Sequence, residues 1–206
     1  MKVSCIAAVV IVCLTGASVH AMTYLGPPTT RANAGQWSFG GLYSESDQDI
    51  EFDRSIGFDD LEQRTAAALI SVGLADQRAE LYGIFGAASL DQDGFEANDE
   101  FLGGFGARIT TNPVNEDLDW GIAGQFTYLK AEDSAVILGV NTPYDLQAID
   151  IQIGFGPCWR PGNFILYGGP YIHWLEGEIE TTAFGDFDLN VDSWFGAYIG
   201  GGIDVA

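Results

Sequence analysis

The stretch IDIQIGFG, residues 149–156, alternates apolar side chains with polar or small ones without an error. Because successive side chains of a β-strand point to opposite faces, this alternation predicts a strand with one apolar face. The apolar face carries Ile149, Ile151, Ile153 and Phe155, and the other face carries Asp150, Gln152, Gly154 and Gly156. Alternating segments of about ten residues are typical of tilted strands that cross a membrane.

The same pattern recurs along the chain in about eight segments, which predicts an all-β protein. The predicted strands are residues 36–46, 64–75, 79–90, 101–110, 119–128, 149–156, 163–175 and 192–204. Their connections alternate between long acidic stretches (45–63, 91–100, 131–144 and 176–190) and short turns (75–78, 111–115 and 158–162). This rhythm is typical of an up-and-down antiparallel transmembrane β-barrel with long external loops and short periplasmic turns.

The first 21 residues are interpreted as a secretory signal peptide, which leaves residues 22–206 as the barrel domain. Lys2 provides a positive start, residues 5–14 are apolar, and Val19-His20-Ala21 fits a cleavage site. The apolar run is shorter than the roughly 20 residues of a spanning helix. A retained anchor is the alternative, and a lipoprotein signal at Cys13 is disfavoured because Val12 precedes it.

The composition combines a high apolar content with a strong negative charge. The hydrophobic fraction is 47% and the mean hydropathy is +0.11, whereas the formal net charge is −21 and becomes −22 when Lys2 leaves with the leader. Such an acidic chain is not expected to bind nucleic acid. The expected partners are outer-membrane lipid, including lipopolysaccharide, and divalent cations at the acidic loops. The expected state is a monomer without a cofactor.

Alternation alone fits a membrane barrel or a soluble barrel of the lipocalin kind. Two features favour the membrane. The less apolar face is mostly Gly and Ala, which suits a narrow lumen better than a wet surface. Aromatic residues near the segment ends, namely Trp37, Tyr43, Trp120 and Tyr128, fit the two membrane interfaces.

In its segments, connections and leader, the chain resembles the small bacterial outer-membrane β-barrel family of OmpA membrane domains and opacity-type proteins. The resemblance is one of architecture and implies an outer-membrane location. Family members usually end in an aromatic residue, whereas this sequence ends in Asp204-Val205-Ala206. A continuation with two more strands past Ala206 would make a barrel of ten strands.

Polar residues on the lumen face predict an internal network of Arg108, Asp119, Gln125, Asp150 and Gln152. If the turn centres near Pro113, Arg108 and Asp119 lie opposite each other. Because an unpaired charge in a narrow lumen is costly, these two are expected to pair, with Asp150 or Gln152 nearby. A structural plug is the favoured interpretation of this network, and a conducting pathway is the alternative.

No motif of catalysis or metal binding is present. His173 is the only histidine after the leader and is a weak catalytic candidate, with Asp192 and Ser193 as potential neighbours. Residues 91–94 lack the spacing of a calcium loop. Cys158, the single cysteine left after cleavage, is expected to be a free, inert thiol.

The sequence therefore favours a non-enzymatic outer-membrane barrel with a structural or surface-interaction role through its acidic loops. The alternatives are a narrow porin-like channel and an enzyme that modifies outer-membrane lipid with His173.

Overall fold

The computed structural model describes residues 7–8, 25–52, 57–92, 95–113, 117–137, 140–181, 185–190 and 195–203. Its regular elements in these ranges are all strands: β1 (Ala7–Ala8), β2 (Trp37–Phe52), β3 (Gly57–Ala75), β4 (Ala79–Gln92), β5 (Phe95–Pro113), β6 (Leu118–Ile137), β7 (Val140–Trp159), β8 (Phe164–Thr181), β9 (Gly185–Asn190) and β10 (Phe195–Ile203). None of the described residues forms a helix long and apolar enough to cross a membrane.

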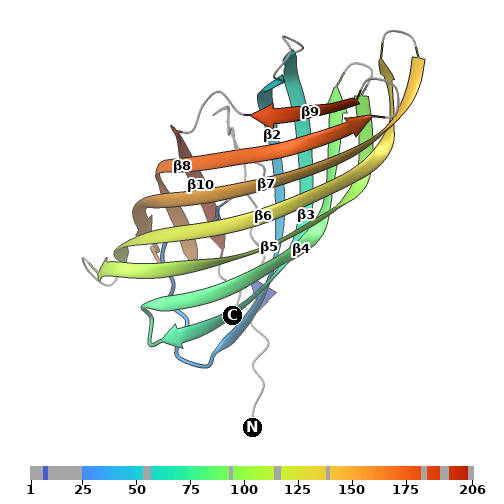
Figure 1. Cartoon of the computed structure of the whole chain (residues 1–206). Coiled ribbons are helices and arrows are strands. Elements are labelled where there is room, and N and C mark those ends of the chain that lie inside the picture. Colours follow the sequence, from blue (N-terminus) through green and yellow to red (C-terminus); the bar gives the residue numbers. More distant parts are fainter. Residues whose placement is uncertain are drawn as a thin grey trace.

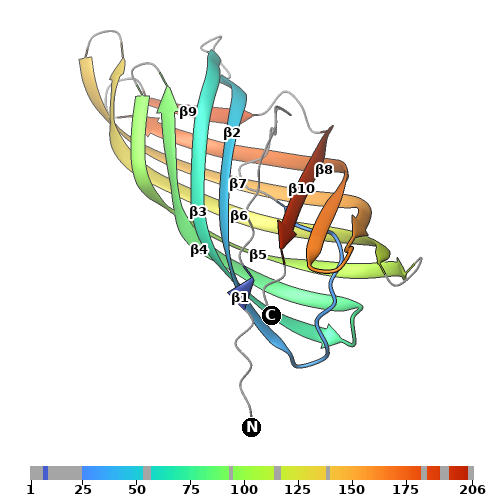
Figure 2. The same cartoon turned by 180° about the vertical axis from the view of Figure 1, so that it is seen from behind.

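From β2 to β8, each strand pairs antiparallel with the next one in sequence. The sheet curves around a common interior (Figures 1 and 2). The predicted all-β, up-and-down antiparallel architecture is therefore confirmed. The eighth predicted strand, 192–204, corresponds to β10, which pairs with β8 along 164–172, whereas β9 lies in the predicted loop 176–190 and pairs with β8 along 176–181.

The acidic connections were expected to be long loops, and this expectation is wrong for most of their length. β2 continues to Phe52 and β3 starts at Gly57, so residues 45–52 and 57–63 are paired strand. The stretches 131–137 and 140–144 are paired in the same way. Apolar alternation marks only the part of a hairpin that faces apolar surroundings, whereas backbone pairing continues beyond it with polar side chains.

The sheet closes on itself at the end away from the short turns. There β9 pairs with β8 and also with β2, through Glu51↔Asn190 and Phe52↔Leu189. The backbone partners can be followed around the sheet from β2 back to β2: Gly41, Ala68, Phe85, Gly103, Tyr128, Ile149, Glu176, Asn190 and Glu51. This path ends ten residues further along β2, at 51 instead of 41. Eight strands with this stagger form a barrel whose strands tilt by about 40°.

Glycines allow the backbones to approach closely inside this narrow barrel. A Cβ atom on Gly156 of β7 would lie 1.9 Å from the carbonyl oxygen of Gly168 on β8, where Gly169 has φ of +157°. A Cβ on Gly106 would lie 2.3 Å from the Tyr82 ring. Glycine at these two positions therefore fits the small interior.

Candidate functional site

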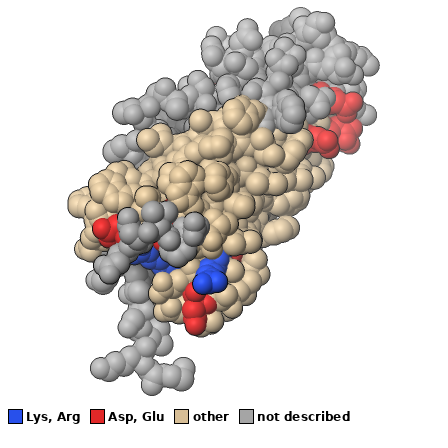
Figure 3. All heavy atoms as spheres, turned by 90° about the vertical axis from the view of Figure 1, so that its left-hand side faces the viewer, with Lys and Arg blue, Asp and Glu red and all other residues tan. Residues whose placement is uncertain are grey.

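The two faces of the barrel are inverted relative to a water-soluble protein. Large apolar side chains are exposed on the outer face of every strand from β2 to β8 and on β10, among them Phe39, Ile70, Leu81, Phe105, Ile122, Ile151, Leu166 and Ile199. Charged and amide side chains are buried on the inner face, among them Glu80, Asp119, Gln125, Asp150, Gln152 and Arg160. In the view of Figure 3, a broad belt without charge separates acidic residues at one end from mixed charges at the other.

The four predicted interface aromatics all lie on the outer face. Trp37 and Tyr43 are strongly exposed, at 63% and 57%. Trp120 and Tyr128 are half-buried, because Trp120 packs on the ring of Phe155 and the Tyr128 hydroxyl donates to Oε1 of Gln147. Trp159 and Trp174, also exposed on this face, were not among the predicted residues.

A layer of ion pairs crosses the interior near the short turns. Arg160 Nη1 lies 3.0 Å from Asp119 Oδ2, and both residues are buried. Arg108 Nη1 lies 3.5 Å from Glu80 Oε1, and its guanidinium stacks 4.4 Å from the centroid of the Tyr82 ring. Carboxylates and guanidinium groups are rarely buried without such partners, so each member of a pair offsets the cost of burying the other member.

Residues 25–36, which precede β2, pass through this layer. The hydroxyl of Thr30 donates to Glu80, and its backbone carbonyl accepts a hydrogen bond from Thr110 Oγ1 at 2.9 Å. Arg160 Nη2 donates to the carbonyl of Thr29 at 3.2 Å, and Arg31 Nε lies 3.3 Å from Asp119 Oδ2. We call residues 25–36 the inner segment. It is held by side chains of β4, β5 and β6 and by Arg160 just after β7.

The expected pairing of Arg108 with Asp119 is wrong. Arg108 lies opposite Ala123, and Asp119 lies opposite Pro113, because β5 stays paired with β6 up to Pro113 instead of turning there. Both residues face the interior, but Arg108 pairs with Glu80 and Asp119 pairs with Arg160.

A second polar layer lies further along the interior, on β6, β7 and β8. Gln152 Nε2 donates to Asp150 Oδ2 at 2.7 Å, and the Tyr82 hydroxyl donates to Gln125 Oε1 at 3.1 Å. His173 Nδ1 lies 3.8 Å from Asp150 Oδ1, and both side chains are completely buried. His173, the weak catalytic candidate of the sequence, therefore lies in the interior, in this second polar layer. Its candidate neighbours Asp192 and Ser193 lie outside the described residues.

Beyond this layer the interior is mainly apolar. Six aliphatic side chains are packed in one buried cluster there: Leu90, Leu102, Leu129, Leu146, Leu175 and Ile179. The barrel interior therefore contains, in order from the turns, the inner segment with its ion pairs, an amide and carboxylate layer, and an aliphatic layer. Cys158 is a buried free thiol near the turns.

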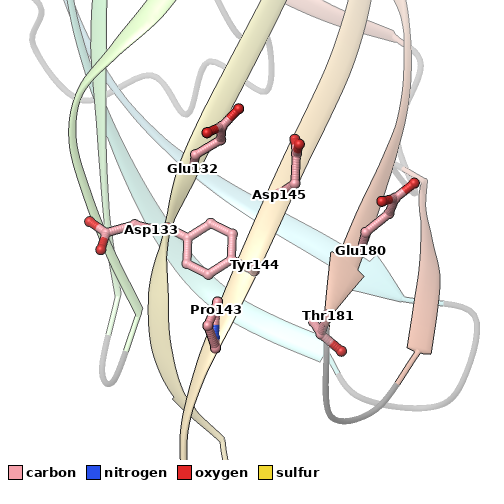
Figure 4. Close-up of a pocket in the computed structure, with 7 residues that line it drawn as sticks. All are labelled: Glu132, Asp133, Pro143, Tyr144, Asp145, Glu180 and Thr181. Atoms are coloured by element: carbon pink, nitrogen blue, oxygen red, sulfur yellow. The ribbon is translucent and has the colours of Figure 1, made fainter.

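An acidic cleft of about 550 Å³ lies on β6, β7 and β8 at the end of the barrel away from the short turns, which we call the outer end (Figure 4). Glu132, Asp145 and Glu180 are neighbours across the three strands. Lys130 contacts Glu132 and lies 3.7 Å from Asp145 Oδ2, so it offsets part of this charge. Burial, followed by the charges of Asp133 and Glu100, raises the pKa of Tyr144 in the cleft. Among the described residues, no group of three or more His, Cys, Asp or Glu side chains is arranged to hold a metal ion.

Sequence reasoning missed Glu80, Arg160 and the inner segment. Glu80 alternates with Leu81 at the start of a predicted strand, so its inward direction was available from the pattern. Arg160 was assigned to a turn. With only 8 Lys and Arg residues against 29 Asp and Glu, each cation beside the inner face was a candidate partner for a buried carboxylate.

The comparisons with known proteins give little beyond this geometry. No protein-family model matches the chain, and no curated protein matches it in sequence. A solved structure, "Copper transporter OprC", is similar with a TM-score of 0.40 and 13% identity; the match covers 82% of this chain. The matched region spans 29% of the length of that transporter chain.

The ion-pair layer predicts a large cost for removing one of its members. In Asp119→Ala, buried Arg160 loses its carboxylate, and the free energy of unfolding is expected to fall by about 3–5 kcal/mol. Arg160→Met in the same chain should recover part of this loss. Denaturant titration of the two single variants and the double variant measures the coupling.

Arg64→Ala is the matched control, because its pair with Glu62 is exposed at 51% and 32% and should contribute about 0–1 kcal/mol. An Asp119→Ala variant as stable as Arg64→Ala would contradict the role assigned to the layer.

Proposed function

We propose that this protein is a bacterial outer-membrane β-barrel of eight strands, without enzymatic activity, that acts through the acidic hairpins at its outer end. The observation that carries the proposal is the inverted distribution of side chains: Phe105 is 63% exposed on the outer face, whereas Asp150 and His173 are fully buried inside. An apolar outer face that continues over every strand from β2 to β8 and over β10 favours association with lipid.

The height of the apolar surface supports a membrane location. On β7 the side chains of the outer face are apolar from Ile149 to Trp159. The next two side chains on this face, towards the outer end, are Gln147 and Asp145. About ten residue steps of roughly 3.3 Å, at a tilt of about 40°, give close to 25 Å, the height of the apolar band of such barrels.

The filled interior favours a structural role over conduction. A barrel of eight strands is just wide enough for its own side chains. Here the inner segment and its ion pairs occupy the turn end, and the aliphatic layer occupies the outer end. This arrangement supports a barrel that does not pass solutes.

The outer hairpins support the assignment of surface interaction. Outward side chains above the apolar band include Glu176, Glu178, Glu180 and Asp188, all exposed. In the proposed orientation this part extends beyond the lipid headgroups, and the short turns and inner segment face the periplasm. The proposed partner of these acidic side chains is lipopolysaccharide, to which divalent cations would bridge them. The alternative of a lipid-modifying enzyme gains no support from His173, because its imidazole is enclosed in the interior.

A membrane barrel of this kind is expected to keep its fold in SDS until it is boiled. We expect the protein in the outer-membrane fraction of a Gram-negative host, with a boiled band that migrates differently from the unboiled band. A protein that is soluble without detergent and shows one band would contradict the membrane assignment.

The filled interior predicts that the intact protein does not conduct ions in planar lipid bilayers. Deletion of residues 25–36 removes the inner segment and exposes Glu80, Asp119 and Arg160 to water, but the aliphatic layer still fills the other end of the interior, so this variant is also expected not to conduct. The heat-dependent gel shift of the deletion variant shows that its barrel has formed. Conductance steps from the intact protein would favour the porin-like alternative.

A further inference from the structure

In the described part of the structure, β10 has a strand partner on one side. It pairs with β8 along its whole length, from Phe195↔Ile172 to Ile203↔Phe164. No pairing with β2 is present there, although β9 joins β2 at the outer end. The ring of strands is therefore closed at its outer end and has a seam between β10 and β2 towards the turns, visible beside β10 in Figure 2.

The pairing register along β8 shifts by one residue between β9 and β10. Asn190 at the end of β9 lies opposite Glu176 of β8, and Phe195 at the start of β10 lies opposite Ile172. The chain advances five residues from 190 to 195, whereas β8 advances four from 172 to 176. The register of β10 on β8 is therefore offset by one residue from the register of β9.

This offset fixes the register in which β10 can meet β2. Asn190 lies opposite Glu51. Position 199 is nine residues beyond 190, and the offset takes up one of the nine, so Ile199 falls opposite the residue eight positions before Glu51, which is Tyr43. The same register places Gly201 opposite Gly41.

The side-chain directions agree with this register. Tyr43 and Ile199 both face outward, with exposures of 57% and 64%. One position inward, buried Leu42 meets buried Gly200. Without the offset, outward Ile199 would lie opposite inward Leu42, which the alternation of a pleated sheet does not permit.

We propose that β10 pairs antiparallel with β2, with Ile199 opposite Tyr43, and so closes the barrel along its full height. The physical reason rests on the proposed membrane location. In hydrocarbon no water is present to satisfy the free N–H and C=O groups of an open strand edge, so a spanning sheet must pair both of its edges.

The leader competes for this edge. β1 pairs parallel with β2, through Ala7↔Phe39 and Ala8↔Gly40. In the proposed register those two positions of β2 pair with Ile203 and Gly202. One strand edge cannot hold both partners, so closure requires that residues 7–8 leave β2. Removal of the leader accomplishes this.

Disulfide cross-linking tests the register. The protein is expressed with its own leader in a Gram-negative host, with Cys158→Ala to remove the native thiol. The test variant adds Tyr43→Cys and Ile199→Cys. Its off-register control is Tyr43→Cys with Ala197→Cys, two residues away on the same face. Ile172→Cys with Phe195→Cys, a pair already opposite in the structure, is the positive control.

Mild oxidation should cross-link the test variant and the positive control within one chain, several-fold faster than the off-register control, because cysteines directly opposite have the required Cβ separation. Mass spectrometry should find the cross-linked chains without residues 7–8; retention of these residues would overturn the competition with the leader.

Three results would overturn the closure itself: a positive control that cross-links while the test variant stays reduced, preferential cross-linking of the off-register control, or a disulfide between two chains. The gel shift on boiling is scored on the same samples. A shift without the 43–199 disulfide leaves the membrane barrel standing and rejects the register, whereas the disulfide in a detergent-free soluble protein supports the register and rejects the membrane.

Discussion

In the proposed membrane location, the requirement that every backbone N–H and C=O group in hydrocarbon be paired within the protein underlies the rest of this structure. A spanning sheet meets it only as a closed ring. The stagger of ten residues between Gly41 and Glu51 sets the tilt of the strands and the narrow width of the interior. From that width follow the close approaches at Gly106 and Gly156 and the burial of inward charged side chains such as Glu80, Asp119 and Asp150.

The interior is organised by the cost of burying charge. Buried Asp119 pairs with Arg160, and buried Glu80 pairs with Arg108. The carbonyl of Thr29 and the hydroxyl of Thr30, in the inner segment, bond to Arg160 and Glu80 of the same layer. Such pairs often contribute little net stability compared with apolar packing, but the loss of one member is expensive. Their effect is therefore to fix the inner segment in one place across the turn end of the barrel. The proposed function is assigned to the acidic hairpins at the other end, where Glu176, Glu178 and Glu180 are exposed.

The sequence was informative where one physical rule acts alone. Alternation at residues 149–156 identified the outward face of β7, and turn chemistry located the short connections at 75–78 and 158–162. The sequence was uninformative where tertiary contacts decide. The acidic residues 45–52 are strand because they continue the hairpin of β2 and β3, whose register is set by its apolar part. The predicted turn at 111–115 was misplaced, because β5 pairs with β6 up to Pro113, and this pairing separates Arg108 from Asp119. The inner segment has no periodicity, and its position depends on side chains from β4, β5 and β6 and on Arg160.

In the proposed membrane location, the outer face of the strands contacts lipid. A nitroxide label on Phe105→Cys, in the Cys158→Ala protein reconstituted in lipid, tests this contact most directly, with Glu178→Cys as the matched position on the outer hairpins. The label at 105 is expected to collide more often with oxygen than with a water-soluble nickel complex, and the label at 178 is expected to show the reverse. Equal access of the nickel complex to both labels would contradict it.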